Sequence, residues 1–356
     1  MATEDMKKAI KILNMEEVEI KGISKIGEGA WHSVYKIEKI MEDAIVIRIK
    51  KKKVYGQLQE FKELDLKTEY ESSKAYYGLA NQCSVNICPS FFKYFLDESI
   101  VFTVESFMGK GRRIQSLNHI EASSLGRKLG IFFQAMHGKS PVIKGFGNLV
   151  WNGERLEGSV QKDSAQIRQA DNHYYVSVMH KLIAADLEFD RDMIVEKIQT
   201  TIKNRRENQQ TISLVNQDIT PENIIFDYPD VSLIDPFPRL DFNLKYAGYF
   251  VFCYKFLLMA YSNAPRYQKN QYHENYEVLS KIADGFIDGY TGESESLYKQ
   301  IMDEYILWTL LETYEHYDML SKEKLSQKTV LQMGNKDIIH QRLKLCLEHL
   351  VNLCRI

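Results

Sequence analysis

The stretch VNQDITPENIIF, residues 215–226, followed by LIDPF at residues 233–237, decides the architecture that we predict for this 356-residue chain. Its first carboxylate, Asp218, stands five residues before an amide, Asn223, in a loop between two apolar runs. A second carboxylate, Asp235, ends a further apolar run. An Asp or Asn in a loop is on its own usually a turn or capping residue. The ordered set of two acids and an amide is what metal-assisted phosphoryl transfer requires.

Each of these residues has an expected role in such a reaction. Asp218 is expected to orient an acceptor hydroxyl and to accept its proton. The amide oxygen of Asn223 and the carboxylate of Asp235 are expected to hold Mg²⁺ on the phosphates. Pro221 suits the tight loop between Asp218 and Asn223, because its ring fixes the backbone φ angle.

A glycine-rich turn, IGEGAWHSVY at residues 26–35, lies near the start of the chain. Gly27 and Gly29 let the backbone approach phosphate oxygens closely, so that amide N–H groups can bind them. An ordinary hairpin turn is an equally good interpretation of two such glycines taken alone. His32 occupies the place of a third glycine, and we interpret it as a loop residue and not as a catalyst.

A cation for the α- and β-phosphates is predicted at Arg48, in the β-branched run of residues 44–49. Lys50 points the same way by the period of two and is the alternative. The cation needs an acidic partner from the helix predicted over residues 68–80, where Glu71 is preferred to Glu69. The rest of the lysine run at residues 50–53 is interpreted as solvated surface.

The run VFTVESFMG, residues 101–109, has the pattern of a buried strand that ends in glycine. Backbone N–H and C=O groups of Glu105 and Phe107 are predicted to pair with an adenine edge. A plain linker between two lobes is the alternative interpretation of the same residues.

The hydrophobic period changes along the chain. Short β-branched runs at residues 18–20, 33–37, 44–49, 91–96 and 100–104 predict an antiparallel sheet, accompanied by one helix. After Gly111 the period becomes helical, with helices predicted over residues 125–137, 172–202, 244–261, 276–290, 297–320 and 337–354. We therefore predict an α+β chain with two lobes. An N-terminal nucleotide-binding β lobe spans residues 1–108, and a mainly helical lobe with the catalytic loop and the acceptor site spans residues 109–356.

The composition bounds the class of protein. Lys and Arg number 46 against 48 Asp and Glu, giving a net charge of -2, which argues against nucleic acid or a lipid surface as the main partner. Five cysteines without a metal-ligand spacing fit free thiols in a reducing cytosol. No apolar run approaches the roughly 20 residues that span a bilayer. A cytoplasmic location is therefore expected.

Together these segments resemble the aminoglycoside phosphotransferase and choline kinase branch of the protein-kinase-like superfamily. The matching elements are the glycine turn, the strand with Arg48, the hinge at residues 104–109, the helix at residues 129–137, the Gly145-Phe146-Gly147 turn, and the segments with Asp218, Asn223 and Asp235. The resemblance implies ATP or GTP with Mg²⁺, Asp218 as base, Asn223 and Asp235 as metal ligands, and Arg48 as the phosphate-binding cation. It also implies a monomer or homodimer that phosphorylates a small hydroxylated molecule. Candidate acceptors are an aminoglycoside-type antibiotic, which such an enzyme would inactivate, or a choline- or sugar-type metabolite.

Three residues depart from the family pattern. Asn216 stands where the family usually has His, Pro236 follows Asp235 in place of Trp or Phe, and Lys245 lies where many members have an Asp that braces the catalytic loop. A non-catalytic kinase-like binding or structural protein is therefore the alternative function. A protein kinase is disfavoured, because the chain after Asp235 leaves little room for an activation loop.

Acids and aromatics at residues 272–277 and 303–318 are candidates for binding a cationic or polyhydroxylated acceptor. Solvated helix faces are the alternative interpretation of both segments, and it carries more weight.

Overall fold

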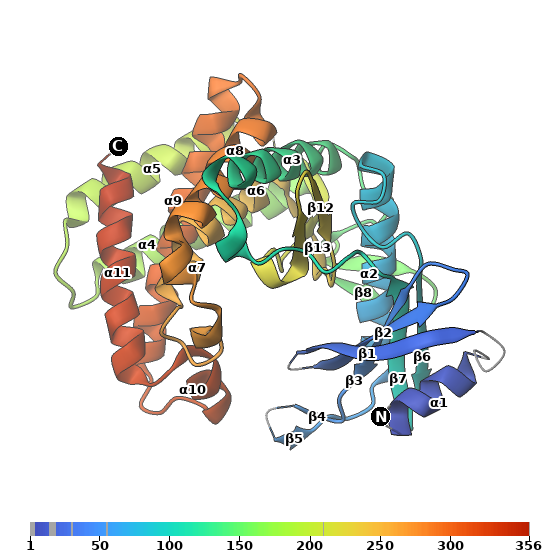
Figure 1. Ribbon diagram of the computed structural model, residues 1–356. Helices are drawn as coiled ribbons and strands as arrows, with labels where there is room; N and C mark the ends of the chain where they lie inside the picture. The colour runs from blue at the N-terminus through green and yellow to red at the C-terminus, as the bar shows by residue number, and fades with distance from the viewer. Residues whose placement is uncertain (1–3, 14–18, 30, 55, 209, 356) are drawn as a thin grey trace.

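The computed structural model describes residues 4–13, 19–29, 31–54, 56–208 and 210–355. Its N-terminal part is an antiparallel sheet with the strand order β1-β2-β3-β7-β6, and Figure 1 shows it set against a larger helical part. The strands are β1 (Ile20–Glu28), β2 (His32–Lys39), β3 (Ile45–Lys50), β6 (Phe92–Asp97) and β7 (Ile100–Ser106). Two helices, α1 (Glu4–Ile12) and α2 (Glu63–Cys83), and a short hairpin of β4 (Lys53–Val54) and β5 (Gln57–Leu58) complete this part.

The strand registers divide the side chains of this sheet between two faces. Directly opposite residues of an antiparallel pair project to the same face. One face packs under α1 into a small core, whose buried members include Met6, Tyr35, Ile47 and Phe102. The other face carries Arg48, which lies opposite Val34 on β2 and Thr103 on β7. The alternation of β3, IVIRIK, thus places its cations on the face away from the α1 core.

The rest of the chain is mainly helical. Its strands are β8 (Phe146–Trp151), β9 (Leu156–Val160), β10 (Ile212–Asn216), β11 (Ile224–Asp227), β12 (Asp230–Leu233) and β13 (Pro238–Phe242). They form a sheet with the order β10-β13-β8-β9 and a separate β11-β12 hairpin. The helices are α3 (His119–His137), α4 (Ser164–Ile183), α5 (Arg191–Glu207), α6 (Asn243–Phe252), α7 (Leu258–Ala260), α8 (Tyr276–Thr291), α9 (Glu295–Ser321), α10 (Gln327–Met333) and α11 (Lys336–Cys354). The predicted α+β architecture is confirmed.

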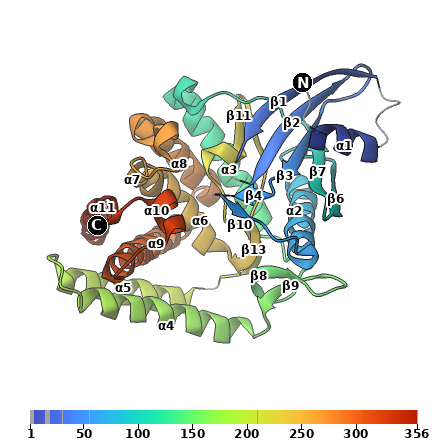
Figure 2. The ribbon, with the colours of Figure 1, turned by 90° about the horizontal axis from the view of Figure 1, so that it is seen from below.

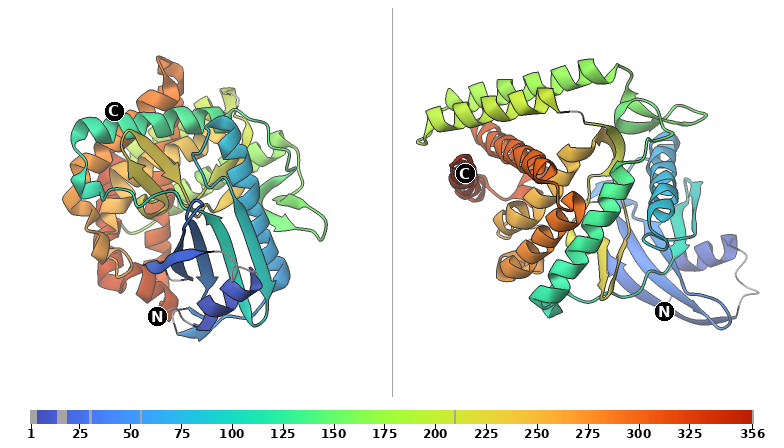
Figure 3. Two further views of the ribbon diagram at one scale, coloured as in Figure 1. Left: turned by 45° about the vertical axis from the view of Figure 1, so that its right-hand side comes forward. Right: turned by 90° about the horizontal axis from the view of Figure 1, so that it is seen from above.

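Two helix predictions need correction. The single helix expected over residues 172–202 is two helices, α4 and α5, which run side by side in Figure 2 and in the right-hand view of Figure 3. The break is fixed by Asp190, which caps α5 by accepting a hydrogen bond from the Met193 N–H at 3.2 Å. The segment predicted as one helix over residues 244–261 contains a π-helical stretch, Cys253–Leu257, between α6 and α7.

The boundaries of the strands also differ from the sequence prediction. The β8-β9 hairpin was not predicted, and the Gly145-Phe146-Gly147 turn leads into it. Gly145 has a φ of +99°, and a Cβ there would lie 3.0 Å from the backbone of Gly158, so the glycine is required by the hairpin itself. Of the first predicted strand, Val18 lies outside the described residues, and β1 begins at Ile20.

Helices α3 and α8 approach each other so closely that their backbones touch through glycines. Gly126 and Gly130 on α3 face α8, and Gly285 and Gly289 on α8 face α3. A Cβ on any of the four would lie 2.0–2.2 Å from a carbonyl oxygen of the other helix. The small-residue spacing of four puts each pair on one helix face, which permits this contact.

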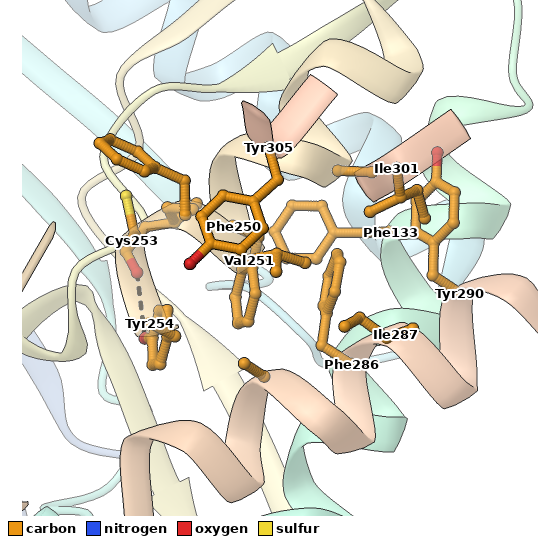
Figure 4. Close-up of a cluster of buried hydrophobic side chains, with 14 of the residues drawn as sticks. Phe133, Phe250, Val251, Cys253, Tyr254, Phe286, Ile287, Tyr290, Ile301 and Tyr305 are labelled. Atoms are coloured by element: carbon orange, nitrogen blue, oxygen red, sulfur yellow. Dashed lines mark hydrogen bonds between the residues drawn. The ribbon is translucent and has the colours of Figure 1, made fainter. Parts of the chain in front are cut away.

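Both helices contribute side chains to a cluster of buried hydrophobic residues, among them Phe133 of α3 and Phe286 of α8 (Figure 4). The Phe250 ring stacks on Phe286 with centroids 4.0 Å apart and on Tyr254 at 4.4 Å. The Tyr254 hydroxyl then donates to the carbonyl oxygen of Ile219 at 3.0 Å. Through this hydrogen bond, the core fixes the position of the loop that contains Asp218. Within the described ranges, no helix has the length and apolar character needed to cross a membrane.

Candidate active site

The loop after β10 is organised by Asn216, whose side chain is buried. Its Oδ1 accepts hydrogen bonds from the Asp218 N–H at 3.0 Å and from the Phe237 N–H at 2.9 Å. Its Nδ2 donates to the Asp218 carbonyl oxygen at 3.2 Å. One amide thus ties the loop of Asp218 to the segment that follows Asp235, so this departure from the family pattern still braces the loop.

The Asp218 side chain is largely enclosed by this loop. The Thr220 hydroxyl donates to its Oδ1 at 3.0 Å. Burial raises the pKa of Asp218 above its usual value, the Thr220 hydrogen bond opposes that shift, and the nearby Asp235 carboxylate adds to it. A carboxylate with a raised pKa is a stronger base than one in water, which suits proton acceptance from a hydroxyl.

Asn223 and Asp235 are brought together by the β11-β12 hairpin, which separates them in sequence. The Ile234 N–H donates to the Asn223 carbonyl oxygen at 3.0 Å, so the two ends of the hairpin lie side by side. Asp235 has a φ of +50°, which is unusual for a residue with a side chain. Its N–H donates to the hydroxyl of Tyr77 at 3.0 Å, and its carboxylate is 50% exposed. Backbone strain of this kind gathers at functional sites.

Arg48 connects the sheet to this segment. Its Nε lies 2.7 Å from Oε1 of Glu105, and its Nη1 lies 3.7 Å from Oδ2 of Asp235. Only 12% of the Arg48 side chain is exposed. Burial acts to lower the pKa of Arg48, but the carboxylates of Glu105 and Asp235 outweigh it and raise the pKa. Residues 48 and 235, distant in sequence, therefore meet where the sheet and the helical part adjoin.

The predicted ion pair between Arg48 and Glu71 is wrong. Glu71 accepts a hydrogen bond from the Tyr94 hydroxyl at 2.6 Å, on the side of β6. Glu69 instead pairs with Lys50, at 2.7 Å. Positions two apart on a helix point about 200° away from each other, so only one of the two acids can face β3. The ion pair between β3 and α2 is thus made by Lys50 and Glu69, which were the alternatives to Arg48 and Glu71.

The sheet already uses the Glu105 backbone and the Phe107 N–H, which were predicted to pair with an adenine edge. Glu105 is paired on both sides, with Val46 of β3 and with Phe92 of β6. The Phe107 N–H donates to the Ala44 carbonyl oxygen at 3.1 Å. Both residues therefore extend the sheet pairing, and the Phe107 donor is already used. The Glu105 side chain contacts the site instead, through Arg48 and through a hydrogen bond from the Tyr77 hydroxyl at 3.3 Å.

The buried pair gives a prediction for stability. Glu105→Gln keeps the size of the side chain but removes the carboxylate that compensates Arg48, so we expect the free energy of unfolding to fall by about 2 kcal/mol. Glu71→Gln is the matched control, and it should change that free energy by less than about 0.5 kcal/mol. Urea denaturation of both variants measures the two effects. A larger loss for the Glu71 variant would contradict the pairing described above.

The glycine turn joins β1 to β2, and Gly27 lies two strands from Arg48 in the same row of the sheet. A Cβ on Gly27 would lie 3.6 Å from Val34, the residue opposite Arg48. Lys51 holds the tip, because its Nζ donates to the Gly29 carbonyl oxygen at 2.8 Å and lies 2.7 Å from Glu28. Lys51 was predicted to be solvated surface, but its side chain is only 25% exposed. The β2-β3 register, in which His32 lies opposite Lys50, brings it to the turn and could have indicated this role.

Other sequence candidates have structural roles. Lys245 does not brace the catalytic loop, because its Nζ pairs with Asp171 of α4 at 2.9 Å. Asp303 accepts hydrogen bonds from Thr201 and Asn204 of α5 at 3.2 Å each. Tyr254, which supports the loop from the core, gave no sequence signal beyond its place in an apolar helix.

Part of the predicted acceptor region does lie beside the loop of Asp218. Glu222, four residues further on, accepts hydrogen bonds from the Asn270 amide and from the Tyr272 hydroxyl. The segment between α7 and α8 therefore contacts the candidate active site.

A large cavity lies on another side of the molecule. It has a volume of about 1850 Å³ and opens behind the hinge, between the β2-β3 connection, the end of α2, α3 and the β11-β12 hairpin. Asp218, Asp235 and Arg48 do not line it, whereas Phe107 does.

The architecture and the order of these elements define a protein-kinase-like fold. No model of a known protein family matches the sequence, and no curated protein matches it. Solved structures do match. A thermostable mutant of aminoglycoside phosphotransferase APH(4)-Ia in ternary complex with ADP and hygromycin B superposes with a TM-score of 0.55 at 13% identity, covering 98% of this chain and 97% of that one. A choline/ethanolamine kinase family protein from Mesorhizobium loti gives 0.51 at 11% identity, covering 98% and 97%.

Proposed function

We propose that this chain is an ATP-dependent kinase that transfers the γ-phosphate to a hydroxyl of a small molecule. The observation that carries the proposal is the 3.7 Å approach of Arg48 on the sheet to Asp235 of the helical part, beside the braced loop of Asp218. These are the groups that phosphoryl transfer needs, since catalysis there consists of positioning and charge stabilisation. Residues 1–108 would bind the nucleotide, and residues 109–356 would supply the catalytic loop and the acceptor site.

The donor set fits a magnesium ion bound largely through phosphate. Mg²⁺ takes oxygen ligands and is commonly held by one or two side chains together with substrate phosphates. In the described part of the chain, no group of three or more His, Cys, Asp or Glu is arranged as a metal site. Asn223 and the half-exposed Asp235 would hold the ion, which would neutralise charge on the phosphates. Arg48 would bind the phosphates, and Asp218 would accept the hydroxyl proton.

The acceptor class is proposed from charge and from the structural neighbours. Glu222 and Tyr272 lie beside the loop of Asp218, and such acidic and aromatic groups suit a ligand with amines and hydroxyls. The neighbouring phosphotransferase structure holds hygromycin B and ADP. An aminoglycoside-type acceptor and ATP as donor are therefore the first pair to test, with choline- and sugar-type alcohols next. A non-catalytic kinase-like protein is the alternative function. The hydrogen bonds by which Asn216 braces the loop of Asp218 argue against this alternative, because the residue that departs from the family pattern still holds the loop.

The test of this function is a screen of hydroxylated small molecules for acceptor-stimulated release of ADP from ATP and Mg²⁺. Aminoglycosides, choline and simple sugars form the first set, and product phosphorylation is followed by mass spectrometry. At least one acceptor should stimulate turnover in the wild type and not in an Asp218 variant. Equal turnover by both forms would refute Asp218 as the base. ATP binding with no turnover of any acceptor would favour the non-catalytic alternative.

Removal of the metal ligand gives a separate prediction. Asp235→Asn keeps the shape of the side chain but removes its charge, so we expect kcat to fall by about 100-fold or more and the Mg²⁺ concentration for half-maximal rate to rise. Chelation with EDTA should abolish the wild-type reaction. Asp227→Asn, on the exposed end of the same hairpin, is the matched control. If the Asp235 variant needed the same Mg²⁺ concentration for half-maximal rate as the wild type, Asp235 would be excluded as a ligand of the metal ion.

A further inference from the structure

His32 lies on the face of the sheet that also carries Arg48. In the β2-β3 register it stands directly opposite Lys50, two places from the pair of Val34 and Arg48. All four side chains therefore project to one face. This places the imidazole at the end of the glycine turn, where the Gly29 N–H donates to the His32 carbonyl oxygen at 3.0 Å. The backbone of His32 is thus part of the glycine turn, and its side chain lies on the same face of the sheet as Arg48.

The imidazole has a buried nitrogen without a protein partner. Nε2 of His32 is inaccessible to solvent and makes no hydrogen bond. Burial lowers the pKa of His32 to about 4, with Asp235 opposing this and Lys50 and Arg48 adding to it. A neutral imidazole has one N–H and one acceptor nitrogen, and a buried donor without an acceptor is costly. In the tautomer with its proton on Nε2, the ring therefore has a donor for a group that binds on the Arg48 face of the sheet.

The charges around the ring indicate what that group is. His137 also has an unpaired Nε2, but it lies in the aromatic core, and burial is the sole cause of its shifted pKa. His32 differs, because Arg48, Lys50 and Lys51 all act on it. Two of these cations share its face of the sheet. Each of these cations now pairs with a carboxylate, Arg48 with Glu105, Lys50 with Glu69 and Lys51 with Glu28. Cations that gather beside an unused donor suit an anion with several oxygens, such as a polyphosphate, which would compete with those carboxylates.

We propose that His32 binds the nucleotide by donating a hydrogen bond from its imidazole to an oxygen of the triphosphate. This inference rests on the proposed function. It adds a side-chain donor to the phosphate site, which the backbone N–H groups of the glycine turn do not supply. The site takes the phosphate chain of a nucleoside di- or triphosphate, and not the nucleoside. His32 is a binding residue on this account, and it takes no part in proton transfer.

The test compares two substitutions by calorimetric titration with AMP-PNP and Mg²⁺, and with adenosine. His32→Phe keeps a ring and removes the donor, so AMP-PNP should bind about 10-fold more weakly or worse, with adenosine affinity unchanged. His32→Gln restores a side-chain N–H and should recover affinity to within about threefold of the wild type. Ser33→Ala, the next residue on the opposite face of β2, is the matched control and should bind both ligands normally.

Each other outcome overturns the inference. Equal AMP-PNP affinity in the wild type and in His32→Phe excludes the hydrogen bond. A parallel loss of AMP-PNP and adenosine affinity shows that the ring only packs the turn. If His32→Gln does not recover the affinity for AMP-PNP, the ring likewise only packs the turn and the proposed hydrogen bond is excluded. A wild type that binds no AMP-PNP refutes the proposed function as well, so the two failures can be told apart.

Discussion

Asp218→Ala is expected to lower kcat for phosphoryl transfer by about 10²–10⁴-fold, the range that a positioned general base contributes. The affinity for ATP and Mg²⁺ should stay within about threefold of the wild-type value, because in the proposed site Asp218 would act on the acceptor and not on the nucleotide. Single-turnover transfer to whichever acceptor the screen identifies measures the first effect, and calorimetry measures the second.

The matched control for this substitution is Thr220→Ala. The Thr220 hydroxyl donates to Asp218 at 3.0 Å and opposes the rise of the Asp218 pKa. Its removal should therefore change the rate far less than loss of the carboxylate does. If Asp218→Ala retained the wild-type rate, another group would have to accept the proton. A joint loss of ATP binding and transfer would mean that the loop had collapsed.

Gly285→Ala is expected to lower the free energy of unfolding by about 3 kcal/mol, the upper part of the range for overpacking. The new Cβ would lie 2.0 Å from the Ser123 carbonyl oxygen of α3, and that contact is with backbone that cannot rotate away. The two helices would have to separate. Because α8 also carries Phe286, the ring that supports Phe250 and the core beneath the loop of Asp218, a loss of transfer activity should accompany the loss of stability.

Gly78→Ala is the matched control, since it makes the same change inside a helix. A Cβ on Gly78 would meet no atom within 4 Å. Alanine has a higher helix propensity than glycine, so this variant should gain about 0.5–1 kcal/mol. Opposite signs for the two variants, measured by urea denaturation, are the expected result. A gain of stability in Gly285→Ala would contradict the close packing of α3 on α8.

The sequence was most informative where chemistry is local. Asp218 and Asn223 are five residues apart, so their shared loop could be predicted from spacing, and the order of sheet, hinge and helices predicted the fold. The hairpin of β8 and β9 escaped prediction because its strands are short and are held by the packing of Gly145 against Gly158.

Partners that depend on tertiary geometry were predicted poorly. The choice between Glu69 and Glu71 turns on the rotation of α2 about its axis, and a single sequence does not fix that angle. The pairing of Arg48 with Glu105 requires the β3-β7 register, which joins residues 57 positions apart. His32 was interpreted as a loop residue, because the direction of its side chain follows from the register with Lys50 and not from its neighbours in sequence.

The central claim is that Asp235 and Asn223 meet Arg48 beneath the glycine turn around a divalent ion and a nucleotide. Calorimetric titration of the wild type with AMP-PNP, with Mg²⁺ and then with EDTA, tests it most directly. The account predicts saturable binding that weakens by about 10-fold or more when Mg²⁺ is removed. Binding that is absent, or that is the same with and without Mg²⁺, would contradict it.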